Sequence, residues 1–145
     1  MTRRLPELSR LELHCLRRLW SLGEASVREV QESLDDEASY STVRKIFERL
    51  EEKKAVERVR RNGAAWIYRS QVSAPDMIRK EIRRLVDVLF DGAGGPLVAH
   101  LADMDAISLD DLRAVESRLD EADGKGEATQ ARSKRPESRD GKAES

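Results

Sequence analysis

The chain has 145 residues, of which 39% are hydrophobic and 38% are charged, and its formal net charge is -1. A single cysteine, Cys15, excludes an intramolecular disulfide and a multi-cysteine zinc site, and no run approaches the roughly 18 apolar residues that span a bilayer. We therefore expect a cytoplasmic protein without membrane contact, built as one domain or as a small domain with an assembly element.

The charge is unevenly distributed along the chain. Residues 40–70 carry nine Lys or Arg against four Glu, a net of +5, whereas residues 76–119 carry six against nine acidic residues, a net of -3. One basic segment inside a mildly acidic protein indicates a surface for an anionic partner such as nucleic acid.

Capping residues mark the starts of the first helices. Ser9 with Glu12 and Ser26 with Glu29 form two capping boxes, and Gly23 ends the first helix. The third helix is expected from about Thr42 to Lys54, with Ser41 as its cap. Its apolar residues occupy the i, i+3, i+4 and i+7 positions of one buried face: Val43, Ile46, Phe47 and Leu50.

A two-stranded hairpin is expected next, because the apolar period changes towards two from Val56 onward. Asn62 and Gly63 supply the positive φ angles of a type I′ turn. The expected packing residues are Val56, Val59, Ile67 and Tyr68. Three helices followed by a hairpin predict a winged helix-turn-helix domain, in a mainly α fold with the hairpin as its wing.

The outward face of the third helix and the hairpin tip form the candidate DNA-contacting surface. A recognition helix enters the major groove, where Arg bonds guanine, Glu accepts from cytosine, and Lys and hydroxyl groups suit phosphate. The candidate residues are Ser41, Thr42, Arg44, Lys45, Glu48 and Arg49 on the helix, and Arg60, Arg61 and Asn62 on the hairpin.

Two observations bear on this interpretation in opposite directions. Arg60 and Arg61 have no evident structural role beside a tight turn, which favours contact with DNA. The charges of the helix could instead pair along that helix, or the domain could bind protein and not DNA. The outward Glu48 and Glu52 favour the protein-binding alternative, because they weaken attraction to phosphate.

The remainder of the chain is expected to be helical and then disordered. Helices are predicted from Pro75 to Phe90, over Pro96 to Leu101, and after a cap at Ser108. This divides the chain into residues 1–73, 74–122 and a polar tail, 123–145. The helices either fold back on the first domain or form a homodimer. The candidate dimer residues are Ile78, Ile82, Leu85, Leu89, Leu112, Val115 and Leu119.

The sequence resembles the BlaI/MecI-type penicillinase repressors over roughly residues 8–122. The resemblance is carried by Glu12 with Leu19 and Trp20, by "GEASVREV", by "YSTVRKIFERLEEKK", by residues 68–73 and by "ISLDDLRAVESRLDE". It implies a winged-helix repressor that dimerises through C-terminal helices and occupies a palindromic operator until it is inactivated.

The chain departs from that family at three points. It has no Asn-Phe pair, the bond cut in the antibiotic-resistance members when a membrane sensor-protease is triggered, and has "LFDGAGGPLV" in that neighbourhood. It has no Cys-x-Cys motif of the kind that binds copper in related repressors. Lys54 stands where many relatives end the recognition helix with glycine. The inducer is therefore expected to be an unidentified protease or ligand.

No catalytic residues, cofactor or metal site are expected. His14 and Cys15 are adjacent and point about 100° apart on a helix, and the chain has neither a glycine-rich phosphate loop nor a nucleophile elbow. The sequence therefore predicts a transcriptional repressor that is not an enzyme, with a DNA operator and a second copy of itself as partners.

Overall fold

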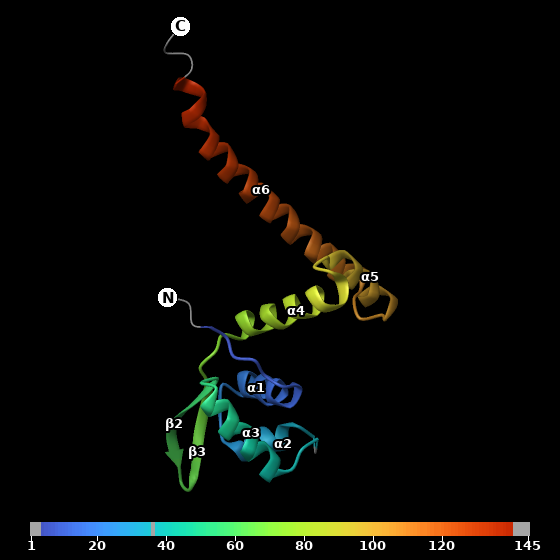
Figure 1. The fold of residues 1–145 in the computed structure, drawn as a ribbon. Coiled ribbons are helices and arrows are strands. Elements are labelled where there is room, and N and C mark those ends of the chain that lie inside the picture. The colour runs from blue at the N-terminus through green and yellow to red at the C-terminus, as the bar shows by residue number, and fades with distance from the viewer. Residues whose placement is uncertain (1–3, 36, 141–145) are drawn as a thin grey trace. The chain divides into compact units, whose positions relative to one another are not determined.

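The computed structural model describes residues 4–35 and 37–140, and their side chains as far as residue 124 (Figure 1). The described residues form six helices and a three-stranded antiparallel sheet. They divide into two compact units, Met1–Leu85 and Val86–Ser145. The first unit contains the sheet and three complete helices.

The first two helices begin where the sequence predicts. Helix α1 (Arg10–Leu22) and helix α2 (Val27–Ser33) both open with complete capping boxes, at Ser9 and Ser26. Gly23 ends α1 with a φ of 82°, a conformation that a residue without a Cβ adopts at little cost. Strand β1 (Glu24–Ala25) lies between the two helices and was not predicted from the sequence.

Helix α3 (Tyr40–Glu52) starts two residues earlier than predicted. The cap is Ser39 and not Ser41, because the Ser39 hydroxyl accepts from the Thr42 amide at 3.2 Å. Ser41 lies in the first turn, where its hydroxyl is 3.2 Å from that of Ser39. The earlier start also gives the Val43 amide a partner in the Ser39 carbonyl, at 3.0 Å.

The end of α3 is a Schellman motif with lysine at its left-handed position. Lys53 is the C-cap, and Lys54 has a φ of 61°. The Ala55 amide donates to the Leu50 carbonyl at 2.8 Å, and the Lys54 amide donates to the Glu51 carbonyl at 3.0 Å. The turn therefore has the geometry that glycine usually supplies, although its residue is lysine.

Strands β2 (Val56–Asn62) and β3 (Ala65–Ser70) form the predicted hairpin, and β3 also pairs with β1, giving the order β1-β3-β2. A bulge shifts the register between Arg58 and Arg60. Because of this shift Asn62 pairs with Ala65, so the two-residue loop is Gly63 and Ala64.

The predicted type I′ turn at Asn62 and Gly63 is therefore wrong. Of the residues at the hairpin tip, only Gly63 has a positive φ, of 65°. Glycine at the first loop position followed by a residue with negative φ is the pattern of a type II′ turn. The burial of Val56 and Tyr68 favours this register over one that places Asn62 in the loop.

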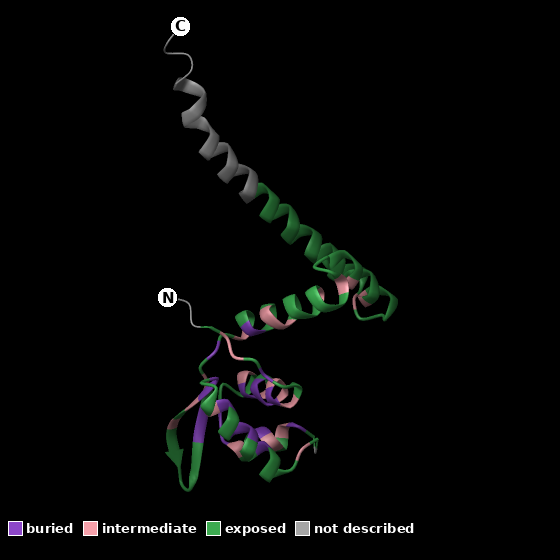
Figure 2. Ribbon diagram, viewed as in Figure 1, coloured by how far each residue is buried: buried purple, intermediate pink, exposed green. Residues whose placement is uncertain are grey.

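The core of the first unit is formed by the apolar faces that the sequence predicts (Figure 2). Val43, Ile46, Phe47 and Leu50 are all buried, and the Phe47 ring meets the Tyr68 ring edge-on, with centroids 5.0 Å apart. Met77 is 1% exposed and belongs to the same core. A boundary at residue 73 would thus remove a core residue from the winged-helix unit.

The C-terminal helices are α4 (Ala74–Phe90), which crosses the boundary between the units, α5 (Gly94–Asp103) and α6 (Leu109–Asp140). Ser108 and Asp111 cap α6 as predicted. In the segment 123–140, however, the predicted disorder is replaced by a continuation of α6. Ten of the 18 residues of this polar stretch are Ala, Glu, Gln, Lys or Arg, which favour helix, although the stretch also contains Gly124, Gly126 and Pro136, which do not. Residues 141–145 of the predicted tail lie outside the described residues.

Much of the apolar surface of these helices is exposed in the single chain (Figure 2). The exposed fraction runs from 37% at Leu112 to 73% at Val88. Every candidate dimer residue belongs to this set: Ile78, Ile82, Leu85, Leu89, Leu112, Val115 and Leu119. In the described part of the chain no single helix is long and apolar enough to cross a membrane, and only α4 and α5 taken together, as a bent pair, reach that length and composition.

Candidate nucleic-acid interface

The outward face of α3 is polar and exposed along its length. The four buried residues Val43, Ile46, Phe47 and Leu50 hold the other face against the core. All six predicted contact residues of the helix are exposed: Ser41, Thr42, Arg44, Lys45, Glu48 and Arg49. The helix therefore presents three basic side chains and one acidic side chain on the surface that the sequence predicts.

The three predicted hairpin residues are also exposed, but the two arginines have partners that the sequence does not reveal. Arg60 forms an ion pair with Glu24 of strand β1. The Arg61 guanidinium lies over the Trp66 ring, 5.1 Å from its centroid. The prediction that neither arginine has a structural role is therefore wrong for Arg60.

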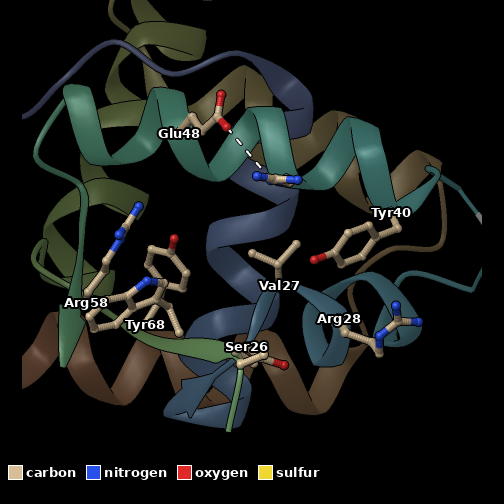
Figure 3. A pocket seen from close by; sticks show the side chains of 11 residues that line it. Ser26, Val27, Arg28, Tyr40, Glu48, Arg58 and Tyr68 are labelled. Carbon is tan, nitrogen blue, oxygen red and sulfur yellow. Dashed lines mark ion pairs between the residues drawn. The ribbon is translucent and has the colours of Figure 1, made fainter. Parts of the chain in front are cut away.

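An open cleft of about 570 Å³ lies between α3, the start of α2 and the wing (Figure 3). Arg44 and Glu48 line it from α3, and Arg58, Trp66 and Tyr68 line it from the wing. The remaining lining residues are Ser26, Val27, Arg28, Tyr40, Ala64 and Ala65. Arginines thus face this cleft from α2, from α3 and from β2.

Several of these cleft residues were missed by sequence reasoning. Arg28 lies over the Tyr40 ring at 4.9 Å, and Arg58 lies over the Trp66 ring at 5.0 Å. Their shared signal is an arginine placed beside an aromatic side chain from another element. That signal is invisible before the bulge in β2 and the packing of α2 on α3 are known.

The cleft is electropositive, since three arginines and one glutamate carry its formal charges, a net of +2. Glu48 forms an ion pair with Arg44 across one helical turn, with 4.0 Å between Nε and Oε1, so the charge of Glu48 is partly compensated. Glu51 pairs with Arg58 at 3.0 Å, and Lys53 pairs with Glu12 of α1 at 2.8 Å. Two of these three ion pairs thus join the C-terminal end of α3 to α1 and β2, and one lies within α3. Pairing along α3 alone does not account for the helix charges.

The Glu12–Lys53 pair fixes the C-terminal end of α3 to α1. Glu12 is buried, and burial works to raise the pKa of its carboxyl, but hydrogen bonds from Lys53 and Ser9 outweigh this and hold the pKa below its ordinary value of 4.5. Lys53 Nζ also donates to the Glu7 carbonyl at 2.9 Å. Helix α3 is thereby anchored at its C-terminal end, opposite its N-cap.

Other candidate reactive groups have structural environments. Cys15 is fully buried, and burial raises the pKa of its thiol to about 11, so the thiol stays protonated. His14 Nδ1 lies 2.8 Å from a Glu37 carboxylate oxygen. Within the described ranges, no group of three His, Cys, Asp or Glu side chains could hold a metal ion.

A three-helix core, a hairpin wing and a basic outward face on the third helix define a winged-helix DNA-binding domain. Solved structures with a similar fold include the DNA-binding domain of the repressor BlaI, which is 22% identical, with coverage of 52% of this chain and 93% of that chain and a TM-score of 0.45.

Two further solved structures match a larger part of the chain. A cysteine-to-serine mutant of MarR from E. coli, complexed with operator DNA, is 15% identical over 80% of this chain and 76% of that chain, with a TM-score of 0.47. A mutant of ZitR from Lactococcus lactis is 12% identical over 86% and 80%, also with a TM-score of 0.47. No curated protein sequence matches the chain significantly.

The family is established by sequence. The family model described as "Penicillinase repressor" matches residues 8–121, which is most of the chain. The chain therefore belongs to the penicillinase repressor family, a family of transcriptional repressors, and it is a DNA-binding transcription regulator.

Proposed function

We propose that the protein represses transcription by binding a palindromic operator as a homodimer, with α3 in the major groove and the wing on the adjacent backbone. The observation that carries this proposal is the outward face of α3, where Arg44, Lys45 and Arg49 are exposed and the opposite face is locked into the core. A helix held in this way presents a fixed set of side chains to the bases.

The side chains of α3 divide by chemistry into two groups. Arg44, Glu48 and Arg49 carry the sequence preference, because arginine bonds the O6 and N7 atoms of guanine and glutamate accepts from N4 of cytosine. Lys45 and the hydroxyls of Ser41 and Thr42 bind phosphate and set the position of the helix. Arg61 and Asn62 at the end of the wing complete the contact with the backbone, whereas Arg60 is held by its ion pair with Glu24.

Dimerisation is supported by the apolar residues of α4 and α6, which are exposed in the single chain. Exposed apolar area on this scale is unfavourable in water, and a second copy offers a matching surface. A twofold dimer presents two recognition helices to two half-sites, which is why the operator should be palindromic.

The chain is proposed to act in the cytoplasm and to be released from its operator by an unidentified protease or ligand. Release by an Asn-Phe cut is not available to it, since the sequence has no such pair. Release by copper through a Cys-x-Cys motif is equally unavailable, since Cys15 is the single cysteine.

Selection from a random duplex library at moderate salt tests the proposal. We expect enrichment of a twofold-symmetric sequence, bound by two chains per duplex. Enrichment of a single half-site would contradict the homodimer. No enrichment by folded protein would contradict operator binding and favour the alternative, a winged-helix module that binds protein.

A further inference from the structure

The register of the wing sorts its arginines onto two faces. Opposed residues of an antiparallel pair share a face, and neighbours along a strand alternate. Arg58 is opposite Tyr68, and Arg61 is opposite Trp66, whereas Arg60 is opposite Ile67. Since Trp66 and Tyr68 are two residues apart on β3, the bulge places Arg58 and Arg61 on one face and Arg60 on the other.

The side-chain contacts agree with this division. Two guanidinium groups lie over the Trp66 ring, with Arg58 at 5.0 Å and Arg61 at 5.1 Å from its centroid. Arg58 is further held by Glu51 of α3, at 3.0 Å. Trp66 also lines the cleft beside α3 and is 37% exposed. This face of the wing, which we call the cleft face, thus carries Trp66 with two arginines in contact with its ring.

The opposite face of the wing is occupied by structural ion pairs. Arg60 pairs with Glu24 of β1, and Arg69 pairs with Glu57 of β2. Glu24 and Glu57 are both opposite Arg69 in the sheet, on the strands to either side of β3. On this face the basic side chains are neutralised by carboxylates that join the three strands.

We propose that the cleft face of the wing binds a phosphodiester, with Trp66 as the positioning residue of two ligands: Arg58, which lines the cleft, and Arg61, which lies on the same face of the wing. This proposal rests on the proposed function and refines it. Arg58 and Trp66 join the interface, and Arg60 becomes a structural residue that fastens the wing to β1.

The physical basis is the entropy of the arginine side chains. A free arginine loses most of its rotamer freedom when it is fixed on a ligand. Stacking on Trp66 restricts both guanidinium groups before DNA arrives, so less is lost on binding. The contact with the ring face leaves the edge of the Arg61 guanidinium for a phosphate oxygen, whereas Arg58 also donates to Glu51 and would share its N–H donors between that carboxylate and the phosphate.

The test uses the full chain and the duplex obtained by selection, and it measures log K against log salt concentration for four variants. Arg61→Ala removes one proposed phosphate ligand from each wing, and Arg60→Ala is its matched control with the same loss of charge on the other face. Trp66→Leu removes the positioning ring without changing the charge, and Trp66→Phe restores an aromatic ring. Circular dichroism checks the fold of each variant.

The expected results follow from counterion release, at about 0.9 for each phosphate contact. Arg61→Ala should flatten the slope by about 1.8 for the two wings of a dimer, and weaken binding about tenfold. Arg60→Ala should leave the slope unchanged. Trp66→Leu should flatten the slope although its charge is that of the wild type, and Trp66→Phe should recover most of it.

Three results would overturn the proposal. Equal slopes for Arg60→Ala and Arg61→Ala would contradict the assignment of these two arginines to different faces of the wing. This comparison tests the proposal even if Trp66→Leu does not fold. Weaker binding by Trp66→Leu at an unchanged slope would give Trp66 a purely structural role. A steep wild-type slope that no wing variant alters would refute this inference alone, whereas a wild type without salt-dependent binding would refute the proposed function itself.

Discussion

Replacing Lys54 by glycine should stabilise the winged-helix unit, because Lys54 closes the Schellman motif of α3 with a φ of 61°. The left-handed conformation costs a residue with a Cβ about 1–2 kcal/mol. Glycine avoids this cost but adds about 0.4–1 kcal/mol of unfolded-state entropy. The expected net effect of Lys54→Gly is a gain of about 0.5–1 kcal/mol in the free energy of unfolding.

Urea unfolding followed by tryptophan fluorescence measures this gain, since Trp20 and Trp66 both lie in the first unit. Protein concentration is held constant, because dimerisation would contribute to apparent stability. Lys54→Ala is the control: it removes the same charge but keeps the Cβ, so it should not stabilise the protein. A midpoint for Lys54→Gly at or below that of Lys54→Ala would refute the argument from backbone conformation.

Three further predictions concern the recognition helix, its anchor and the dimer. Arg49→Ala should cost about 1–3 kcal/mol on the selected operator and relax its sequence preference; an equal loss on random DNA would assign Arg49 to phosphate. Glu12→Gln should lower the free energy of unfolding by about 1–3 kcal/mol at neutral pH. Because the folded state holds the Glu12 pKa below 4.5, the wild type loses this stabilisation as the pH falls below that value, and the stability of the variant should depend less on pH there. Leu89→Glu, which places a charge in the exposed apolar set of α4, should give monomers in sedimentation analysis, and a dimer of wild-type affinity would contradict the proposed interface.

The buried faces and the caps at Ser9, Ser26 and Ser108 were predictable because they depend on local pattern. The stripe of Val43, Ile46, Phe47 and Leu50 is buried as its helical spacing requires. Ser9 and Ser26 each have a glutamate three residues on, and both form complete capping boxes. Such signals lie within one helical turn, so the sequence contains all the information that they need.

The start of α3 and the register of the wing were not predictable in the same way. Ser39 and Ser41 are both good caps for one apolar stripe, and only the hydrogen bonds of the first turn distinguish them. The position of the bulge between Arg58 and Arg60 depends on which residues of both strands are buried, and not on the pattern of one strand. One residue of register decides which face an arginine occupies, so the cleft face could not be derived from period alone.

The partners of the charged residues were the least predictable feature. Arg60 meets Glu24 only because the two-residue strand β1 pairs with β3, and a strand of that length has no periodicity to detect. Glu51 and Lys53 pair with Arg58 and with Glu12, which come from other elements. Ion pairs between elements distant in sequence appear only once the fold is known.

The salt dependence of wild-type binding to its selected duplex tests the central claim most directly, namely that an exposed basic face formed by α3 and the wing binds DNA as a dimer. With about 6 phosphate contacts per dimer, the plot of log K against log salt concentration should have a slope near -5, at a measured stoichiometry of two chains per duplex. A slope near zero, or a complex of one chain per duplex, would contradict the account.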